Sequence, residues 1–151
     1  MPISDQTALY NLLKEAFLLL DFGDRVLFSR YNLTAPRFYA LVHLGDEPGL
    51  SLKRLSQKMF CDKSNATRIF KGLEAEGYAE RRKHETDGRS YRLVLTPLGE
   101  TVREQVIAEH EAYNQMRLDF ISHTEQSSLS ESLTQLNRQL QLSLDGDAIQ
   151  A

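Results

Sequence analysis

The sequence predicts a mainly α-helical protein that carries one two-stranded β hairpin. Apolar residues recur at helical spacing over most of the chain. One Asp-Gly pair lies between two short strand-like segments, at 78–84 and 90–95, which is typical of a hairpin. The 151 residues suffice for one domain with a sizeable core, or for a small domain with an extension.

Four helices are expected before the hairpin. The first covers about 5–28, with Leu9, Leu12, Leu13, Ala16, Phe17 and Leu20 at helical spacing. Thr34 is the expected N-cap of a second helix that ends near residue 45, with Pro36 in its first turn. After the turn at 46–49, Ser51 precedes a short third helix, and Asp62 caps a longer fourth helix that ends at Gly77.

Two helices are expected after the hairpin. Thr96 and Pro97 form a cap and a first helical residue, and this helix covers about 97–122. The last helix covers about 126–143, and residues 145–151 are expected to fray. Residues 34–96 therefore contain two helices, a tight turn, a third helix and a hairpin, which is the order of a winged helix-turn-helix.

Charge is distributed unevenly along the chain, although the net charge is only −3. Residues 1–52 carry four Lys/Arg and six Asp/Glu, residues 53–92 carry eleven and six, and residues 93–151 carry three and nine. The middle is therefore at +5 and the ends are at −2 and −6. A basic middle favours an anionic partner, although a solvated charged surface would show the same composition.

The expected helix at 63–76 carries two opposite stripes. The apolar stripe consists of Ala66, Ile69, Phe70 and Leu73. The polar stripe consists of Ser64, Thr67, Arg68 and Lys71, with Asn65 between the two. No acid occurs on the polar face before Glu74, whereas ordinary amphipathic surface helices mix acids with bases. These groups can donate to base edges and phosphates in a DNA major groove, so we interpret this segment as a recognition helix.

The hairpin is the second basic element. Its cations are Arg81, Arg82, Lys83, Arg89 and Arg92. A ribbon tipped with arginine can reach an adjacent minor groove, and narrow A·T-rich grooves attract arginine. A charged edge that keeps a sheet soluble is the alternative, and the hairpin alone does not decide between them.

Residues 64–100 resemble the MarR family of bacterial transcription regulators. The matching features are Thr67-Arg68, Leu73-Glu74, Gly77, Arg82, Asp87-x-Arg89-Ser90, Leu95-Thr96 and Gly99. The resemblance implies a homodimeric, ligand-responsive repressor that binds double-stranded DNA at a pseudo-palindromic operator. It implies major-groove contacts from Ser64, Asn65, Thr67, Arg68 and Lys71. It also implies that Arg89 enters the minor groove and that Asp87 pairs with it to hold its orientation.

The resemblance also implies a division of the chain. Residues 34–96 would form the DNA-binding domain, and residues 5–28 with 97–144 would form a helical dimerisation region. The residues themselves agree, because the first and last helices carry leucine stripes that need a partner; in the last helix these are Leu129, Leu133, Leu136 and Leu140. Two positions depart from the family pattern: Gly88 replaces a frequent second wing arginine, and Arg37 replaces a frequent glutamine.

Other sites are weaker in the sequence. An aromatic or phenolic effector could bind a cluster of Phe28, Arg30, Tyr31, Arg37, Phe38, Tyr39 and His43, which otherwise belongs to the core. Cys61 is expected to be a small buried residue rather than a redox sensor. The spacing of the histidines, His43 and His110 included, matches no strong metal site, so we expect no metal and no cofactor.

The remaining expectations concern function class and location. No glycine-rich phosphate loop, nucleophile elbow or useful Cys/His pairing indicates an enzyme. No apolar run is long enough for a membrane span or a signal sequence, so we expect a cytoplasmic protein. The alternative function is a winged-helix module that binds another protein and no DNA.

Overall fold

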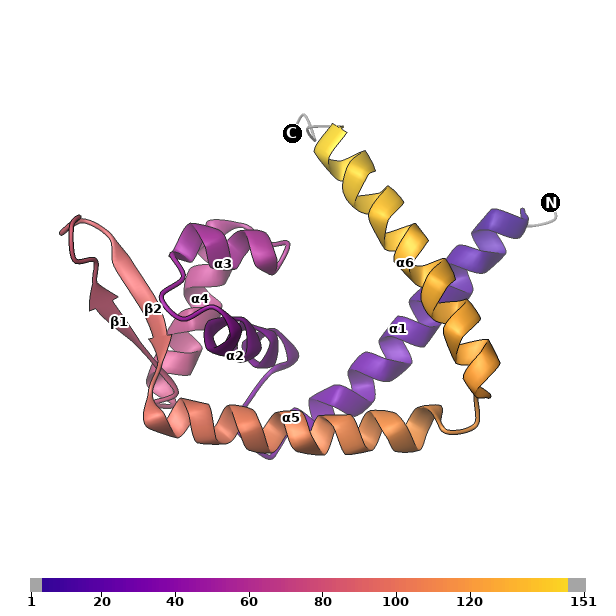
Figure 1. The fold of residues 1–151 in the computed structure, drawn as a ribbon, viewed down its shortest axis with the longest axis horizontal. Helices are drawn as coiled ribbons and strands as arrows, with labels where there is room; N and C mark the ends of the chain where they lie inside the picture. Colours follow the sequence, from indigo (N-terminus) through magenta and orange to yellow (C-terminus); the bar gives the residue numbers. More distant parts are fainter. Residues whose placement is uncertain (1–3, 147–151) are drawn as a thin grey trace. The chain divides into compact units, whose positions relative to one another are not determined.

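A computed structural model describes residues 4–146, and the side chains of residues 4–145 (Figure 1). The elements in chain order are α1 (Asp5–Ser29), α2 (Ala35–Asp46), α3 (Leu52–Lys58), α4 (Lys63–Ala75), β1 (Ala79–Lys83), β2 (Tyr91–Leu95), α5 (Pro97–Leu118) and α6 (His123–Gly146). The chain divides into two compact units, Met1–Glu111 and Ala112–Ala151. Most of the tail that was expected to fray, residues 147–151, lies outside the described residues.

Local capping explains where the helices of the first unit begin. The side chains of Thr34, Ser51 and Asp62 each accept a hydrogen bond from the backbone N–H three residues on, as the sequence predicted for Thr34 and Asp62. Thr96 does the same for α5 by accepting from the N–H of Gly99 at 3.0 Å. Gly77 has φ of +75° just past the end of α4, a conformation that glycine adopts without strain.

The two strands pair in the expected antiparallel hairpin, with Ala79 opposite Leu95 and Lys83 opposite Tyr91. Each strand is shorter than predicted, because residues 84–90 lie outside both strands. The predicted Asp-Gly turn lies within this loop, where the Ser90 N–H donates to the Asp87 carbonyl at 3.1 Å. Leu50 adds an unexpected bridge to Leu93, whose N–H donates to the Leu50 carbonyl at 2.8 Å. A bridge of one residue has no periodicity and therefore leaves no pattern in the sequence.

The core of the first unit lies where α2, α3 and α4 meet. The predicted apolar stripe of α4 is buried, and Phe70 and Leu73 are fully inaccessible. Phe28 at the end of α1 stacks on Phe38 of α2 with ring centroids 4.1 Å apart. The guanidinium of Arg37 lies against α4 at Gly72. A Cβ on residue 72 would overlap this guanidinium, so the glycine leaves the space that Arg37 occupies.

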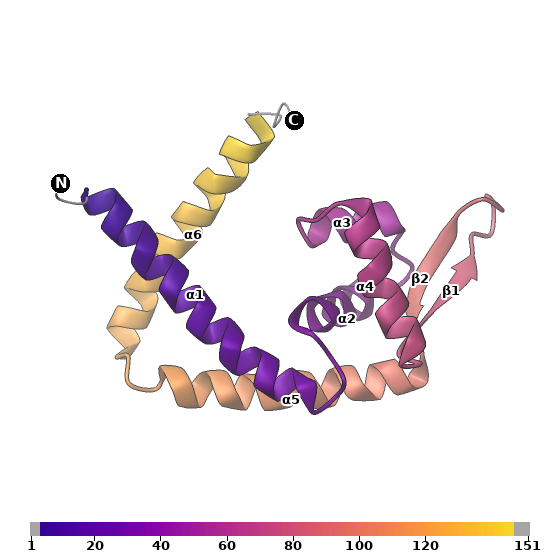
Figure 2. The ribbon, with the colours of Figure 1, turned by 180° about the vertical axis from the view of Figure 1, so that it is seen from behind.

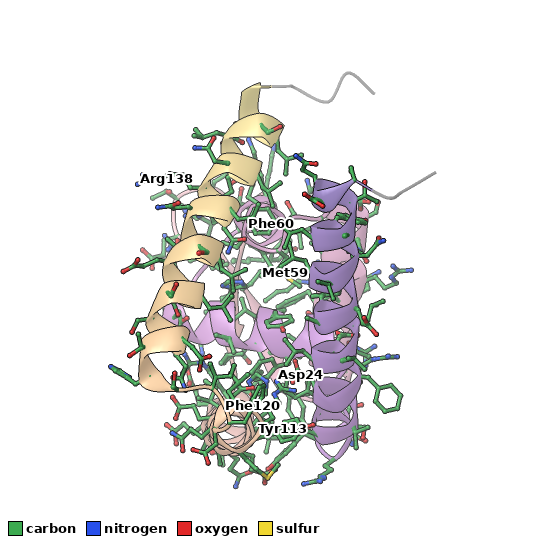
Figure 3. All side chains as sticks on the ribbon, turned by 90° about the vertical axis from the view of Figure 1, so that its right-hand side faces the viewer. Asp24, Met59, Phe60, Tyr113, Phe120 and Arg138 are labelled. Atoms are coloured by element: carbon green, nitrogen blue, oxygen red, sulfur yellow. The ribbon has the colours of Figure 1, made fainter. Side chains whose placement is uncertain are left out.

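A histidine–aspartate pair, in which Asp24 is buried and His110 is partly buried, joins α1 to α5 beside this core. His110 Nε2 lies 3.0 Å from Oδ1 of Asp24, which is labelled in Figure 3, and the His110 ring packs against Phe28 and Phe38. Asp24 is only 6% exposed, so the pair satisfies a carboxylate that would otherwise be costly to bury. His110 is therefore part of the packing between these helices.

The boundary between α5 and α6 differs from the prediction. α5 ends at Leu118 rather than near 122, and α6 begins at His123 rather than near 126. The new start is a capping box, in which the N–H and hydroxyl of Ser122 donate to Glu125 and the Glu125 N–H faces the Ser122 hydroxyl. The leucine spacing predicts a later start, whereas the Ser-x-x-Glu sequence at 122–125 marks the observed one.

Both long terminal helices leave apolar side chains uncovered. On α1, Leu12 is 64% exposed, and on α6, Leu140 is 52% exposed. Apolar stripes of this length are seldom left in contact with water on a helix. In the described part of the chain, no helix is both long enough and apolar enough to cross a membrane.

Candidate nucleic-acid interface

The polar face of α4 points away from the core, as the sequence predicted. Ser64, Arg68 and Lys71 are exposed, and Asn65 and Thr67 are partly exposed. Figure 2 shows α4 between α3 and the β1–β2 hairpin, so that both basic elements belong to the same part of the fold. No acidic residue lies in the first turn of α4. The face therefore combines two hydroxyls, an amide and two cations.

Two hydrogen bonds within α4 define what this face can offer a partner. Arg68 donates from Nη2 to Oδ1 of Asn65 at 2.7 Å, so the amide holds the guanidinium in place. Thr67 donates its hydroxyl proton to the Lys63 carbonyl at 2.8 Å. Its side chain therefore presents a methyl group and an acceptor, and the donors of this face come mainly from the other four residues.

The wing consists of β1, β2 and the loop 84–90 between them. Most of its cations contact side chains of the same unit. Arg81 lies 3.1 Å from Glu74, Arg82 lies 2.8 Å from Glu80, and Arg92 lies 3.3 Å from the Nε2 of His84. Within the described residues, the side chains of Lys83 and Arg89 make no hydrogen bond or ion pair. Of the five arginines and lysines in this hairpin, these two are therefore the ones left for a partner.

Asp87 organises the wing loop through the backbone, not through the guanidinium of Arg89. Its Oδ1 accepts from the Arg89 backbone N–H at 3.0 Å, and its Oδ2 accepts from the Ser90 hydroxyl at 3.0 Å. The ion pair implied by the family resemblance is not formed. The two hydrogen bonds lower the pKa of Asp87, because they favour the charged carboxylate. A short acceptor side chain at the start of a turn does this more directly than an exposed ion pair.

We expect Asp87→Ala to loosen the wing loop while leaving global stability nearly unchanged. The alanine removes both acceptors, so the amides of Arg89 and Ser90 should exchange faster with solvent. Asp87→Asn retains one acceptor oxygen and should protect the Arg89 amide better than alanine does. Since the folded pKa is lowered, the wild-type protection should hold at neutral pH and disappear as pH falls through the folded pKa, below about 4. Amide exchange by NMR measures this, and equal exchange in all three proteins would contradict it.

Comparison with known proteins identifies the fold around this interface. The sequence model of the MarR family matches residues 31–90. Residues 31–90 therefore resemble a MarR-family domain. TtmR, an HTH-type transcriptional regulator of Methylorubrum extorquens, is 35% identical over 75 residues. The organic hydroperoxide resistance transcriptional regulator of Bacillus subtilis is 28% identical over 81 residues. These alignments cover 50% and 54% of this chain but only 38% and 55% of the two relatives.

Solved structures match the MarR fold over nearly the whole chain. FabT of Streptococcus pneumoniae, solved in complex with DNA, has a TM-score of 0.80 at 23% identity and covers 91% of this chain and 98% of its own. AbsC of Streptomyces coelicolor, a MarR family transcriptional regulator, has a TM-score of 0.82 at 20% identity, covering 93% and 98%. At these identities the likeness shows the fold, including the long helices beyond residues 31–90.

An apolar pocket of about 460 Å³ lies between α1, α2 and the end of α3. It is lined by Phe17, Asp21, Ala35, Pro36, Tyr39, His43, Lys58, Met59 and Phe60. Met59 and Phe60 are labelled in Figure 3. Of the cluster expected from the sequence, Tyr39 and His43 line this pocket, whereas Phe28 and Phe38 stack in the core. The sequence did not reveal Phe17, Met59 and Phe60 because they come from distant segments.

We expect His43 to make the stability of the first unit, Met1–Glu111, depend on pH. Burial lowers the pKa of His43, and the Lys58 ammonium lowers it further. The unfolded chain, with an ordinary histidine pKa near 6.5, therefore binds more protons, so this residue lowers stability as pH falls below about 6.5. Urea unfolding at about pH 5.5 and about pH 7.5 should show a smaller pH difference in His43→Gln than in the wild type. An NMR titration of His43 at or above the ordinary value would contradict this.

The remaining candidates from the sequence are the thiol of Cys61 and the histidines as metal ligands. Cys61 is half-buried, and burial, with the nearby Asp62 charge, raises the pKa of its thiol, which reduces the reactive thiolate. Among the residues that the structure describes, no three His, Cys, Asp or Glu side chains come together as metal ligands.

Proposed function

We propose that this chain is a DNA-binding transcription regulator, a ligand-responsive repressor that acts as a homodimer on a pseudo-palindromic operator. The observation that carries the proposal is the acid-free outward face of α4 beside a wing with an unpaired arginine at its tip. The transcription regulators among its relatives support it, as does the DNA complex of FabT, which has the same fold.

In this proposal α4 enters the major groove. Arg68 reads a base edge, with Asn65 holding its guanidinium, and Ser64, Thr67 and Lys71 contact neighbouring bases or phosphates. Arg89 reaches the adjacent minor groove from the exposed wing tip. Asp87 keeps the loop folded so that the Arg89 side chain leaves it in a defined direction. Gly88 has no charged side chain, so Arg89 alone would make this minor-groove contact.

The dimer would use the long helices outside the domain at 34–96. The uncovered leucines of α1 and α6 support an interface built from residues 5–28 and 97–144. A two-fold dimer presents two recognition helices to half-sites about 34 Å apart, so the symmetry of the protein would match that of the operator.

The apolar pocket beside α1 supports the ligand response. Aromatic side chains on its walls and the Lys58 ammonium at its rim suit a small aromatic or phenolic acid, although Lys58 is paired with Glu47 at 3.0 Å without a ligand. Such an effector would release the operator only if it bound a dimer with mismatched helix spacing more tightly than the DNA-bound dimer.

DNA binding distinguishes this proposal from the alternative of a winged-helix module that binds proteins. Fluorescence anisotropy with duplexes from the gene's own upstream region should find one that binds more tightly than unrelated DNA. The logarithm of its affinity should fall with the logarithm of salt concentration by about 0.9 per phosphate neutralised. No affinity for any duplex, or an affinity that salt leaves unchanged, would overturn the proposal.

A further inference from the structure

A basic pocket lies between the helix-turn-helix and the wing. Its volume is about 300 Å³. The walls come from the start of α3, the first residue of α4, and the wing strands with their loop. The lining residues are Ser51, Leu52, Lys53, Lys63, Arg81, Arg89, Ser90, Tyr91 and Leu93. Four of these are cations, none is an acid, and the two serines and the tyrosine add hydroxyl groups, so the pocket has the composition of an anion site.

Three of the four cations in this pocket have no partner within the described residues. In the described residues, the side chains of Lys53, Lys63 and Arg89 make no hydrogen bond or ion pair. Arg81 differs, because its Nε lies 3.1 Å from Glu74 and its guanidinium lies over the Phe70 ring at 5.4 Å. These two contacts hold Arg81 at the wall of the pocket without bringing Glu74 into the lining.

Helix stability does not account for the lysines either. Lys53 lies in the first turn of α3 and Lys63 is the first residue of α4, and neither first turn contains an acid. Backbone N–H groups at the start of a helix disfavour a cation, so Lys63 is placed where it weakens its own helix. The cap Asp62 uses Oδ1 to accept from the Asn65 N–H. An anion from outside the domain would give both lysines a partner.

We propose that this pocket binds one phosphate group of the DNA backbone, held by Lys53, Lys63 and Arg81. The inference rests on the proposed function. It adds a contact to the DNA backbone at a point between α4, which would enter the major groove, and Arg89, which would enter the minor groove. Charged donors make short, strong hydrogen bonds to phosphate oxygens, and Ser90 adds a hydroxyl beside them. Because a phosphate is the same at every base pair, this contact would set the register of α4 and the wing on DNA without selecting a sequence.

The test compares salt dependence in variants of the full-length protein. A dimer has two such pockets, so the double variant Lys53→Gln/Lys63→Gln should reduce the salt slope by about 1.8. Its affinity should fall by the same factor for the operator and for an unrelated duplex. Lys53→Arg/Lys63→Arg retains both charges and should keep the wild-type slope.

The outcomes separate this inference from the proposed function. If the wild type binds no duplex, the proposed function fails together with the phosphate contact. If the wild type binds DNA but the glutamine variant keeps its slope, or loses affinity for the operator alone, the inference is wrong. A titration with inorganic phosphate at constant ionic strength tests whether the pocket binds free phosphate instead of a DNA phosphate. Saturable shifts of the Lys63 and Ser90 amides in the wild type, combined with an unchanged DNA slope in the variant, would assign the pocket to free phosphate and also overturn the inference.

Discussion

Arg68→Ala is expected to weaken binding to the operator by about 5- to 160-fold and to relax base preference at one position in each half-site. These factors correspond to the roughly 1–3 kcal/mol that a bidentate arginine–guanine contact contributes to discrimination. Arg68 is the candidate for this contact because it is exposed on the outward face of α4 and its guanidinium is held by Asn65 at 2.7 Å. Anisotropy titrations with the operator and with single-base variants of it measure both effects.

Arg89→Ala is the matched comparison, since it removes the same side chain from the wing. It should lower affinity, but it should leave discrimination at the major-groove positions close to that of the wild type. Asn65→Ala should resemble a weaker form of Arg68→Ala, because it frees the guanidinium without removing it. If Arg68→Ala and Arg89→Ala both bind the operator as tightly as the wild type, the proposed placement of α4 and the wing on DNA is incorrect.

Gly99→Ala is expected to lower the free energy of unfolding by about 3 kcal/mol or more, at the upper end of the cost of overpacking a core. Gly99 lies in the first turn of α5, where the helix presses against the backbone of Tyr78. A Cβ at this position would overlap the Tyr78 carbonyl oxygen and lie 2.8 Å from its carbonyl carbon. That oxygen also accepts from the Thr96 N–H at 3.1 Å, so Tyr78 cannot move away from the start of α5 without losing this bond.

The control for this prediction is Gly88→Ala in the wing loop. A Cβ on Gly88 would meet no atom within 4 Å, and its φ is not in the left-handed region. The same substitution should therefore change the free energy of unfolding by less than about 0.5 kcal/mol. Urea unfolding of the three proteins checks both values, and similar stability of Gly99→Ala and Gly88→Ala would refute the close approach of α5 to Tyr78.

The parts of the fold that depend on near neighbours in the chain were predictable. The caps at Thr34, Ser51, Asp62 and Thr96 act on residues within one helical turn, so the amino acids that form them stand next to each other in the sequence. The polar face of α4 was also predictable, because helical periodicity alone places the buried stripe opposite the polar one.

The wing was only partly predictable. Its basic composition was visible, but the sequence could not show that Arg81 pairs with Glu74, or that Asp87 bonds the backbone of Arg89 instead of its guanidinium. The first contact joins two elements, and the second depends on the conformation of a seven-residue loop. Periodicity predicts which face a residue occupies, but it does not predict which of several nearby polar groups it contacts.

The sequence by itself determined the order of elements, the polar face of α4 and the basic character of residues 53–92, since each follows from local propensity, periodicity or composition. Only the tertiary structure decided which cations stay unpaired, that α5 begins against the Tyr78 backbone, and that Lys53, Lys63 and Arg81 line one pocket. These features bring together residues from three elements that are distant in the chain. Their distances are determined by how the shared core packs, which no short stretch of sequence specifies.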